Sequence, residues 1–192
     1  MKKFLASALM LLAASTTTFA QNAVGSFSLQ PKAGISIADM TDTQGTTSRI
    51  GFVGGLEGEY QASDIFSLSL GVNYSQEGFK MKNFDNKIKL DYINVPILAN
   101  VYLTKGLAVK VGVQPGFNVG NSVTVDGNTM SSSKKDYDGI KSVALSIPVG
   151  LSYEISNVVL DARYNWGVTK AFDGLDSKNS VFQVTIGYKF QL

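Results

Sequence analysis

The chain contains no cysteine and no histidine among its 192 residues. It can therefore form no disulfide, and it lacks the ligands that most zinc sites use. Without histidine it cannot carry out Ser-His-Asp catalysis, which excludes the acyltransferases, lipases and proteases that depend on that residue. We predict that the protein is not an enzyme and that it holds neither a metal nor a cofactor.

Long apolar stretches are absent as well. No apolar run approaches the ~20 residues that a transmembrane helix needs. The formal net charge is +2, and no basic tract indicates nucleic acid as a partner. We therefore expect neither a helical membrane protein nor a nucleic-acid-binding protein.

Residues 1–20 are predicted to be a cleaved signal peptide. Lys2 and Lys3 precede a short apolar run, and the small residues at positions 18 and 20 suit a cleavage site. The run is too short for the alternative, an anchor helix. Removing Lys2 and Lys3 from the 17 basic residues leaves 15, equal to the 15 acidic residues. The mature domain, residues 21–192, is then formally neutral.

The most prominent pattern in the mature domain is the alternation of apolar and polar residues with a period of two, repeated eight times. The expected strands cover residues 27–37, 49–60, 65–77, 88–103, 107–119, 142–154, 158–168 and 180–192. These strands are longer than the ~5–6 residues usual in soluble proteins, and they reach the ~9–11 residues that cross a bilayer at a tilt. In the fourth strand Leu90 and Tyr92 are out of phase with the rest, which predicts a bulge near Tyr92.

The connections between these strands alternate between short and long. Tight turns are expected at 61–64, 104–106 and 155–157, and longer polar loops at 38–48, 78–87, 120–139 and 169–179. Short periplasmic turns and long extracellular loops are typical of bacterial outer-membrane proteins. We therefore predict an all-β fold, an eight-stranded antiparallel up-and-down transmembrane β-barrel with both termini at the periplasmic end.

The polar faces of the strands indicate what fills the barrel. They consist mostly of Ser, Gly, Asn, Gln and Thr, whereas the outside of a soluble barrel would be rich in Lys and Glu. Small polar residues suit a lumen that eight strands leave just wide enough for side chains. Four basic and four acidic residues on these faces are predicted to form a buried ion network, because unpaired buried charges are costly. Its members are Lys32, Glu57, Glu59, Lys110, Glu154, Asp161, Arg163 and Lys189. For Glu57 and Glu59 this structural role is preferred to the alternative, a catalytic carboxylate pair.

Aromatic residues on the apolar faces are predicted to form two membrane-interface belts. Tyr60, Tyr153, Tyr188 and Phe190 lie near the periplasmic ends, and Tyr74, Tyr164 and Trp166 lie nearer the loops. The alternative is the aromatic core of a soluble sandwich. Apolar residues in the expected loops could contact a partner or lipopolysaccharide, or be scattered surface residues of no special role. They are Phe79, Met81, Phe84, Met130, Phe172 and Leu175.

Three motifs resemble those of the PorT-like outer-membrane β-barrel family. Residues 160–169, LDARYNWGVT, resemble the family's RYxxG-hydrophobic-T strand, and residues 71–79, GVNYSQEGF, resemble its YSQxG hairpin end. Residues 92–98, YINVPIL, resemble its Y-hydrophobic-x-IP segment, with Asn94 where the family pattern has Glu. The resemblance implies an outer-membrane barrel and leaves its function open.

We therefore predict a non-enzymatic integral protein of the cell outer membrane with a structural, envelope-integrity or loop-mediated binding role. The alternatives are a narrow porin-like pore for small solutes and a soluble periplasmic lipocalin-like binder. The expected partners are outer-membrane lipid and lipopolysaccharide, together with a ligand at the extracellular loops. The barrel-insertion machinery is a further expected partner, because the alternation of Ile186, Tyr188, Phe190 and Leu192 resembles its recognition signal. We expect a monomer.

Heat-dependent gel migration tests this assignment. A closed barrel keeps its hydrogen-bonded wall in detergent, so unheated protein from an outer-membrane fraction should migrate faster than boiled protein. Mature protein that stays monodisperse in buffer without detergent would contradict the prediction.

Overall fold

The computed structural model describes residues 23–40, 46–81, 87–125, 128–132, 142–170 and 178–192. The strands are β1 (Phe27–Met40), β2 (Thr46–Ser63), β3 (Phe66–Met81), β4 (Lys87–Asn94), β5 (Ile97–Thr104), β6 (Leu107–Val125), β7 (Asn128–Ser132), β8 (Val143–Ile155), β9 (Val158–Lys170), β10 (Lys178–Tyr188) and β11 (Phe190–Gln191). Within the described ranges, no helix has the length and apolar character needed to cross a membrane.

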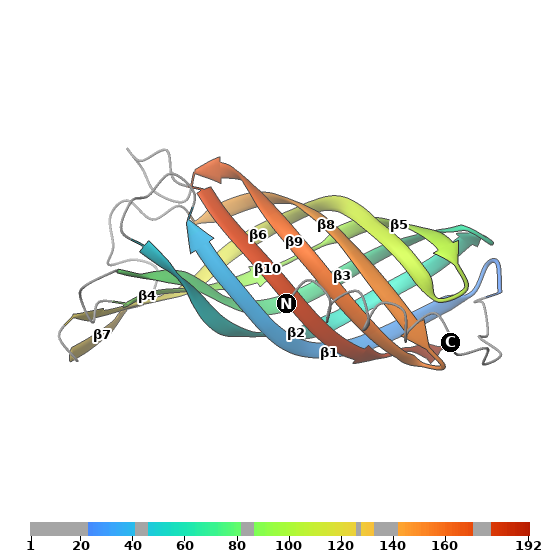
Figure 1. Ribbon diagram of the computed structural model, residues 1–192, viewed down its shortest axis with the longest axis horizontal. Helices are drawn as coiled ribbons and strands as arrows, with labels where there is room; N and C mark the ends of the chain where they lie inside the picture. The colour runs from blue at the N-terminus through green and yellow to red at the C-terminus, as the bar shows by residue number, and fades with distance from the viewer. Residues whose placement is uncertain (1–22, 41–45, 82–86, 126–127, 133–141, 171–177) are drawn as a thin grey trace, which may run out of the picture.

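The strands close into an antiparallel barrel (Figure 1). Neighbours follow the order β10-β9-β8-β6-β4-β3-β2-β1, and β1 also pairs with β10. Ala33, for example, lies opposite Gly54 on one side and Ile186 on the other. β5 continues the path of β4, and β11 continues that of β10, so the wall has eight staves. The predicted eight-stranded antiparallel barrel is confirmed.

The fourth stave is irregular at two points. The ladder with β6 shifts register between Asp91 and Tyr92, so the predicted bulge near Tyr92 is present. The stave then breaks between Asn94 and Ile97, because Pro96 has no N–H to donate to a ladder. Around the break, the Val95 N–H donates to the Pro115 carbonyl over 2.8 Å, and Gly71 donates to the Pro96 carbonyl over 2.9 Å.

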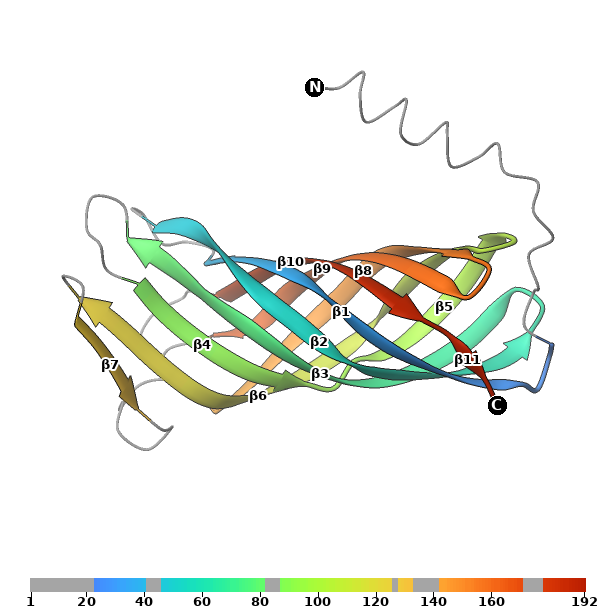
Figure 2. The same cartoon turned by 90° about the horizontal axis from the view of Figure 1, so that it is seen from below.

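The two ends of the barrel differ, as the connection lengths predict. The turns that join β2 to β3, β5 to β6 and β8 to β9 lie at the end that holds the C-terminus, while β7 lies at the opposite end (Figure 2). In the β5–β6 turn, Gly106 has a φ of +87°, a conformation that glycine adopts without strain.

The long loops are shorter than predicted. β6 extends to Val125 and pairs with β7, so residues 120–125 and 128–132 of the expected 120–139 loop form a hairpin. β1, β3 and β9 likewise continue to Met40, Met81 and Lys170. The ladder continues beyond the alternating pattern because backbone pairing does not require an apolar face.

The expectation of six exposed loop residues is wrong for Phe79. This side chain lies in β3 and is buried, because the end of β3 pairs with β2 and β4 and turns Phe79 inward. Met81 and Met130 also lie in strands rather than loops. Phe84, Phe172 and Leu175 lie outside the described residues.

The two faces of the wall are sorted as an integral membrane barrel requires. Along β3, the apolar Leu68, Leu70 and Val72 point outward and are 49–58% exposed, while Ser67 and Ser69 point inward and are at most 3% exposed. A soluble barrel would bury its apolar residues and expose its polar ones. The periplasmic lipocalin-like alternative is therefore wrong.

Two arginine substitutions on the outer wall test where the barrel lies in the membrane. Val111 lies on this wall, opposite Ala99 and Val149, and is 44% exposed. Val111→Arg should destabilise the protein folded in lipid vesicles by about 2–4 kcal/mol, as at a bilayer midplane. Val143→Arg, on the same wall at the loop end of β8, is the matched control and should cost only about 0–1 kcal/mol. Equal losses in guanidinium titrations would contradict this placement.

Candidate functional site

The interior of the barrel is the candidate functional site, because the charged side chains of the strands converge there. Every second residue of each stave points inward, and these residues are mostly polar. The structure places all eight residues of the expected ion network on this inner face, each at most 9% exposed. They form two groups of contacts.

The first group, here the Glu57 cluster, comprises Lys32, Glu57, Lys110, Asp161 and Arg163. The Glu57 carboxylate pairs with Lys32 on the adjacent strand, with Lys110 Nζ at 2.9 Å and with Arg163 Nη2 at 3.2 Å. Asp161 pairs with Lys110 at 3.0 Å and with Arg163 at 2.8 Å. These pairs join β1, β2, β6 and β9, which are not all neighbours in the wall, so the cluster spans the lumen.

The second group, here the Lys189 cluster, lies nearer the C-terminal end of the barrel. Lys189 Nζ pairs with Glu154 at 2.7 Å and with Glu59 at 3.1 Å. Glu59 also accepts hydrogen bonds from the Ser67 hydroxyl at 2.6 Å and from the Tyr102 hydroxyl. Glu57 and Glu59 therefore belong to different clusters, each engaged by cations, rather than to one carboxylate pair.

The charges of the two clusters compensate each other. The Glu57 cluster has three cations against two carboxylates, and the Lys189 cluster has one cation against two. Buried ions are tolerated when partners and hydrogen bonds replace the lost water. Together the eight charged groups are neutral, which lowers the electrostatic cost of burying them in the lumen.

Glycines beside the long cations provide the space that these side chains occupy. Gly150 lies directly opposite Lys110 on one side and Arg163 on the other. A Cβ on Gly150 would lie 2.6 Å from the Ala162 carbonyl oxygen and 3.2 Å from Arg163 Cβ, so even alanine would collide with the wall. At this level of the inner face, a small residue therefore lies between two long cations.

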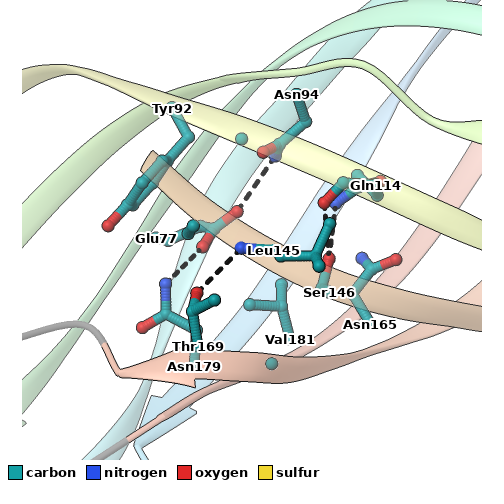
Figure 3. Close-up of a pocket in the computed structure, with 13 residues that line it drawn as sticks. Glu77, Tyr92, Asn94, Gln114, Leu145, Ser146, Asn165, Thr169, Asn179 and Val181 are labelled. Atoms are coloured by element: carbon teal, nitrogen blue, oxygen red, sulfur yellow. Dashed lines mark hydrogen bonds between the residues drawn. The ribbon is translucent and has the colours of Figure 1, made fainter. Parts of the chain in front are cut away.

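The loop-side half of the lumen holds a different arrangement. Glu77 accepts hydrogen bonds from the side-chain amides of Asn94 and Asn179, each at 3.1 Å (Figure 3). Beside it lies a cavity of about 20 Å³, enough for one water-sized particle. Arg49 donates to the backbone carbonyl of Glu77, not to its carboxylate.

Sequence reasoning did not single out these loop-side residues. Glu77 and Arg49 share the inward phase of their strands, so the alternation itself was the available signal. Asn179 could not be found in this way, because it was expected in a loop.

The predicted interface aromatics lie on the outer wall. Tyr60, Tyr74, Tyr164, Trp166, Tyr188 and Phe190 are 37–60% exposed, and Tyr153 is half-buried. The rings of Tyr188 and Phe190 lie 4.8 Å apart, and the Tyr164 hydroxyl is 2.8 Å from Ser180 Oγ. Their role at the membrane interface stays a prediction.

Neutralising one carboxylate tests how much the clusters stabilise the barrel. Glu57→Gln leaves three buried cations with one carboxylate fewer, so it should lower the free energy of unfolding by about 3–5 kcal/mol. Glu154→Gln, which leaves Lys189 paired with Glu59, should cost less and serves as the matched control. Equal losses in denaturant titrations would show that the spanning contacts of Glu57 add nothing.

Comparisons with known proteins agree with this architecture. The structure is similar to Ail, the attachment invasion locus protein of Yersinia pestis, with a TM-score of 0.52 and 19% identity over 87% of this chain and 99% of that one. It is also similar to Neisserial surface protein A, with a TM-score of 0.57 and 20% identity over 85% of this chain and 97% of that one. At these identities the likeness shows the fold alone. Among curated proteins, no sequence matches this chain.

The family comparison extends over most of the sequence. Residues 19–173 match the model of the outer membrane protein beta-barrel domain. The closed barrel, the outward apolar wall and this match agree with one another. The chain therefore belongs to the outer membrane protein beta-barrel domain family, and its place is the outer membrane.

Proposed function

We propose that this protein is a non-enzymatic outer-membrane barrel that conducts no solutes, supports the envelope structurally and binds through its loops. The observation that carries the proposal is the Glu57 cluster, which crosses the lumen between strands on different sides of the wall. Such a cluster obstructs the passage of solutes through the lumen, and it also ties together strands on different sides of the wall.

The obstacle is steric and electrostatic. The side chains of Lys32, Lys110 and Arg163 are at most 4% exposed, and each contacts Glu57, Asp161 or both. Selective pores present rings of one charge or of carbonyl oxygens to the permeating ion. Here cations and carboxylates contact one another directly, so these five residues present neither kind of ring.

Catalysis is disfavoured by the same contacts. A general acid or base has to reach a substrate, and Glu57 and Glu59 are instead buried and bound to lysine, arginine, tyrosine or serine side chains. The chain also contains no histidine, the side chain whose ordinary pKa lies closest to neutrality.

Recognition is assigned to the loop end because a filled barrel leaves only its outer wall and its connections for binding. β7 and the end of β6 extend the wall at this end (Figure 2). The expected ligands are lipopolysaccharide or a partner at the cell surface.

We further propose that the chain is related to the PorT-like family, on the three sequence motifs, and that residues 1–20 are a cleaved signal peptide. We also propose that the barrel-insertion machinery inserts the protein and that it is a monomer.

Conductance in planar bilayers tests the closed lumen. The refolded protein should show no sustained single-channel currents. Replacing Glu57 and Arg163 together by serine removes one charge of each sign, keeps the lumen neutral and should produce currents. The matched control, Leu151→Ser with Val184→Ser, alters the outer wall at two exposed positions and should stay silent.

Sustained currents through the unaltered protein would favour the alternative function, a narrow pore for small solutes. A silent double lumen variant that is otherwise folded would show that a different part of the barrel closes the path.

A further inference from the structure

Glu77 differs from the other buried carboxylates of the lumen. Glu57, Glu59, Glu154 and Asp161 each contact a lysine or arginine side chain. Glu77 is 5% exposed, and in the part of the chain that the structure describes its carboxylate contacts no cation. Two amide donors, from Asn94 and Asn179, are its interstrand partners.

An uncompensated charge at such a place is costly. Moving a carboxylate out of water without a counter-charge costs far more than neutral hydrogen bonds restore. The guanidinium of Arg49 donates to the backbone carbonyl of Glu77, not to its carboxylate. A counter-charge from outside the protein would remove this penalty.

Two of the side chains that line the cavity beside Glu77 carry an oxygen without a partner. The side-chain oxygens of Gln114 and Asn165 are buried without a hydrogen bond among the described residues. These two side chains are only 2–3% exposed. Figure 3 shows Gln114 and Asn165 on the opposite side of the lining from Glu77, with Leu145 and Ser146 between them in this view. Buried polar atoms are nearly always satisfied, so this group indicates an occupant such as a water molecule or an ion.

We propose that this cavity binds one dehydrated monovalent cation, an alkali ion such as Na⁺ or K⁺. The Glu77 carboxylate supplies the charge, and the amide oxygens of Gln114 and Asn165 supply neutral ligands. The volume of about 20 Å³ admits one particle of that size. A single carboxylate among neutral oxygens matches one positive charge, whereas divalent sites of this kind usually gather several carboxylates.

The bound cation would complete the brace at the loop end of the barrel. Glu77 lies on β3, Gln114 on β6 and Asn165 on β9, so one ion would connect three staves. It would act there as the Glu57 cluster acts deeper in the lumen, but with its positive charge taken from the medium.

Thermal unfolding in detergent tests the proposal. The refolded protein is titrated with KCl or NaCl from about 1 to 500 mM, with N-methylglucamine chloride added to keep the ionic strength constant. Above the dissociation constant, each tenfold rise in alkali ion should raise the unfolding temperature by about 3–5 °C. Glu77→Gln should abolish this rise. Asp64→Asn, which removes an exposed carboxylate at the opposite end, should retain it.

Diffraction gives a second measurement that does not depend on a variant. Crystals of the unaltered protein grown with Rb⁺ in place of Na⁺ should show an anomalous peak between Glu77 and Asn165. A cavity with no such peak, or an unfolding temperature that responds to alkali ions equally in Glu77→Gln, would overturn the proposal. So would unfolding that depends on pH but not on the alkali ion, because Glu77 would then be a neutral acid.

Discussion

The structure depends on one constraint: inside a bilayer, every backbone N–H and C=O must be paired within the protein. The pairing of β1 with β10 meets this constraint by closing the sheet on itself. Closure then determines the rest of the design. The apolar residue of each alternating pair faces lipid, the polar residue faces a narrow interior, and every charge on that face is buried.

The interior meets the resulting electrostatic demand in two ways. Towards the C-terminal end, eight side chains neutralise one another, and Glu57 contacts three of their four cations. Glycines such as Gly150 leave room for the long cations, so charge and volume are matched together. Towards the loops, Glu77 has amide donors but no protein cation in the described lumen, and the unpartnered oxygens beside it form a place for an outside ion. The cost of burying charge is therefore met by internal ion pairs towards the C-terminal end and by a candidate cation site towards the loops.

The apolar–polar alternation of the sequence predicts the wall well within the membrane and less well at the loop end. The phase break at Tyr92 predicted a bulge, and the register shift beside Asp91 confirms it. Phe79 was missed because the loop boundary was drawn where the apolar–polar pattern ended, although the hydrogen-bonded ladder continues past it. Asn179 was missed for the same reason. The apolar–polar alternation indicates which residues face lipid. It no longer predicts the strands where they extend beyond the membrane.

The sequence by itself determined the strand count, the face of each residue and the need for internal charge balance, because a period of two decides sidedness one residue at a time. Which charges meet was decided only by the tertiary structure. Glu57 and Arg163 are 106 residues apart, and their contact depends on the stagger of strands around a closed wall. The separation of Glu59 from Glu57 into another cluster, and the isolation of Glu77, follow from that same stagger, since no local pattern encodes which side chains lie at one height in the lumen.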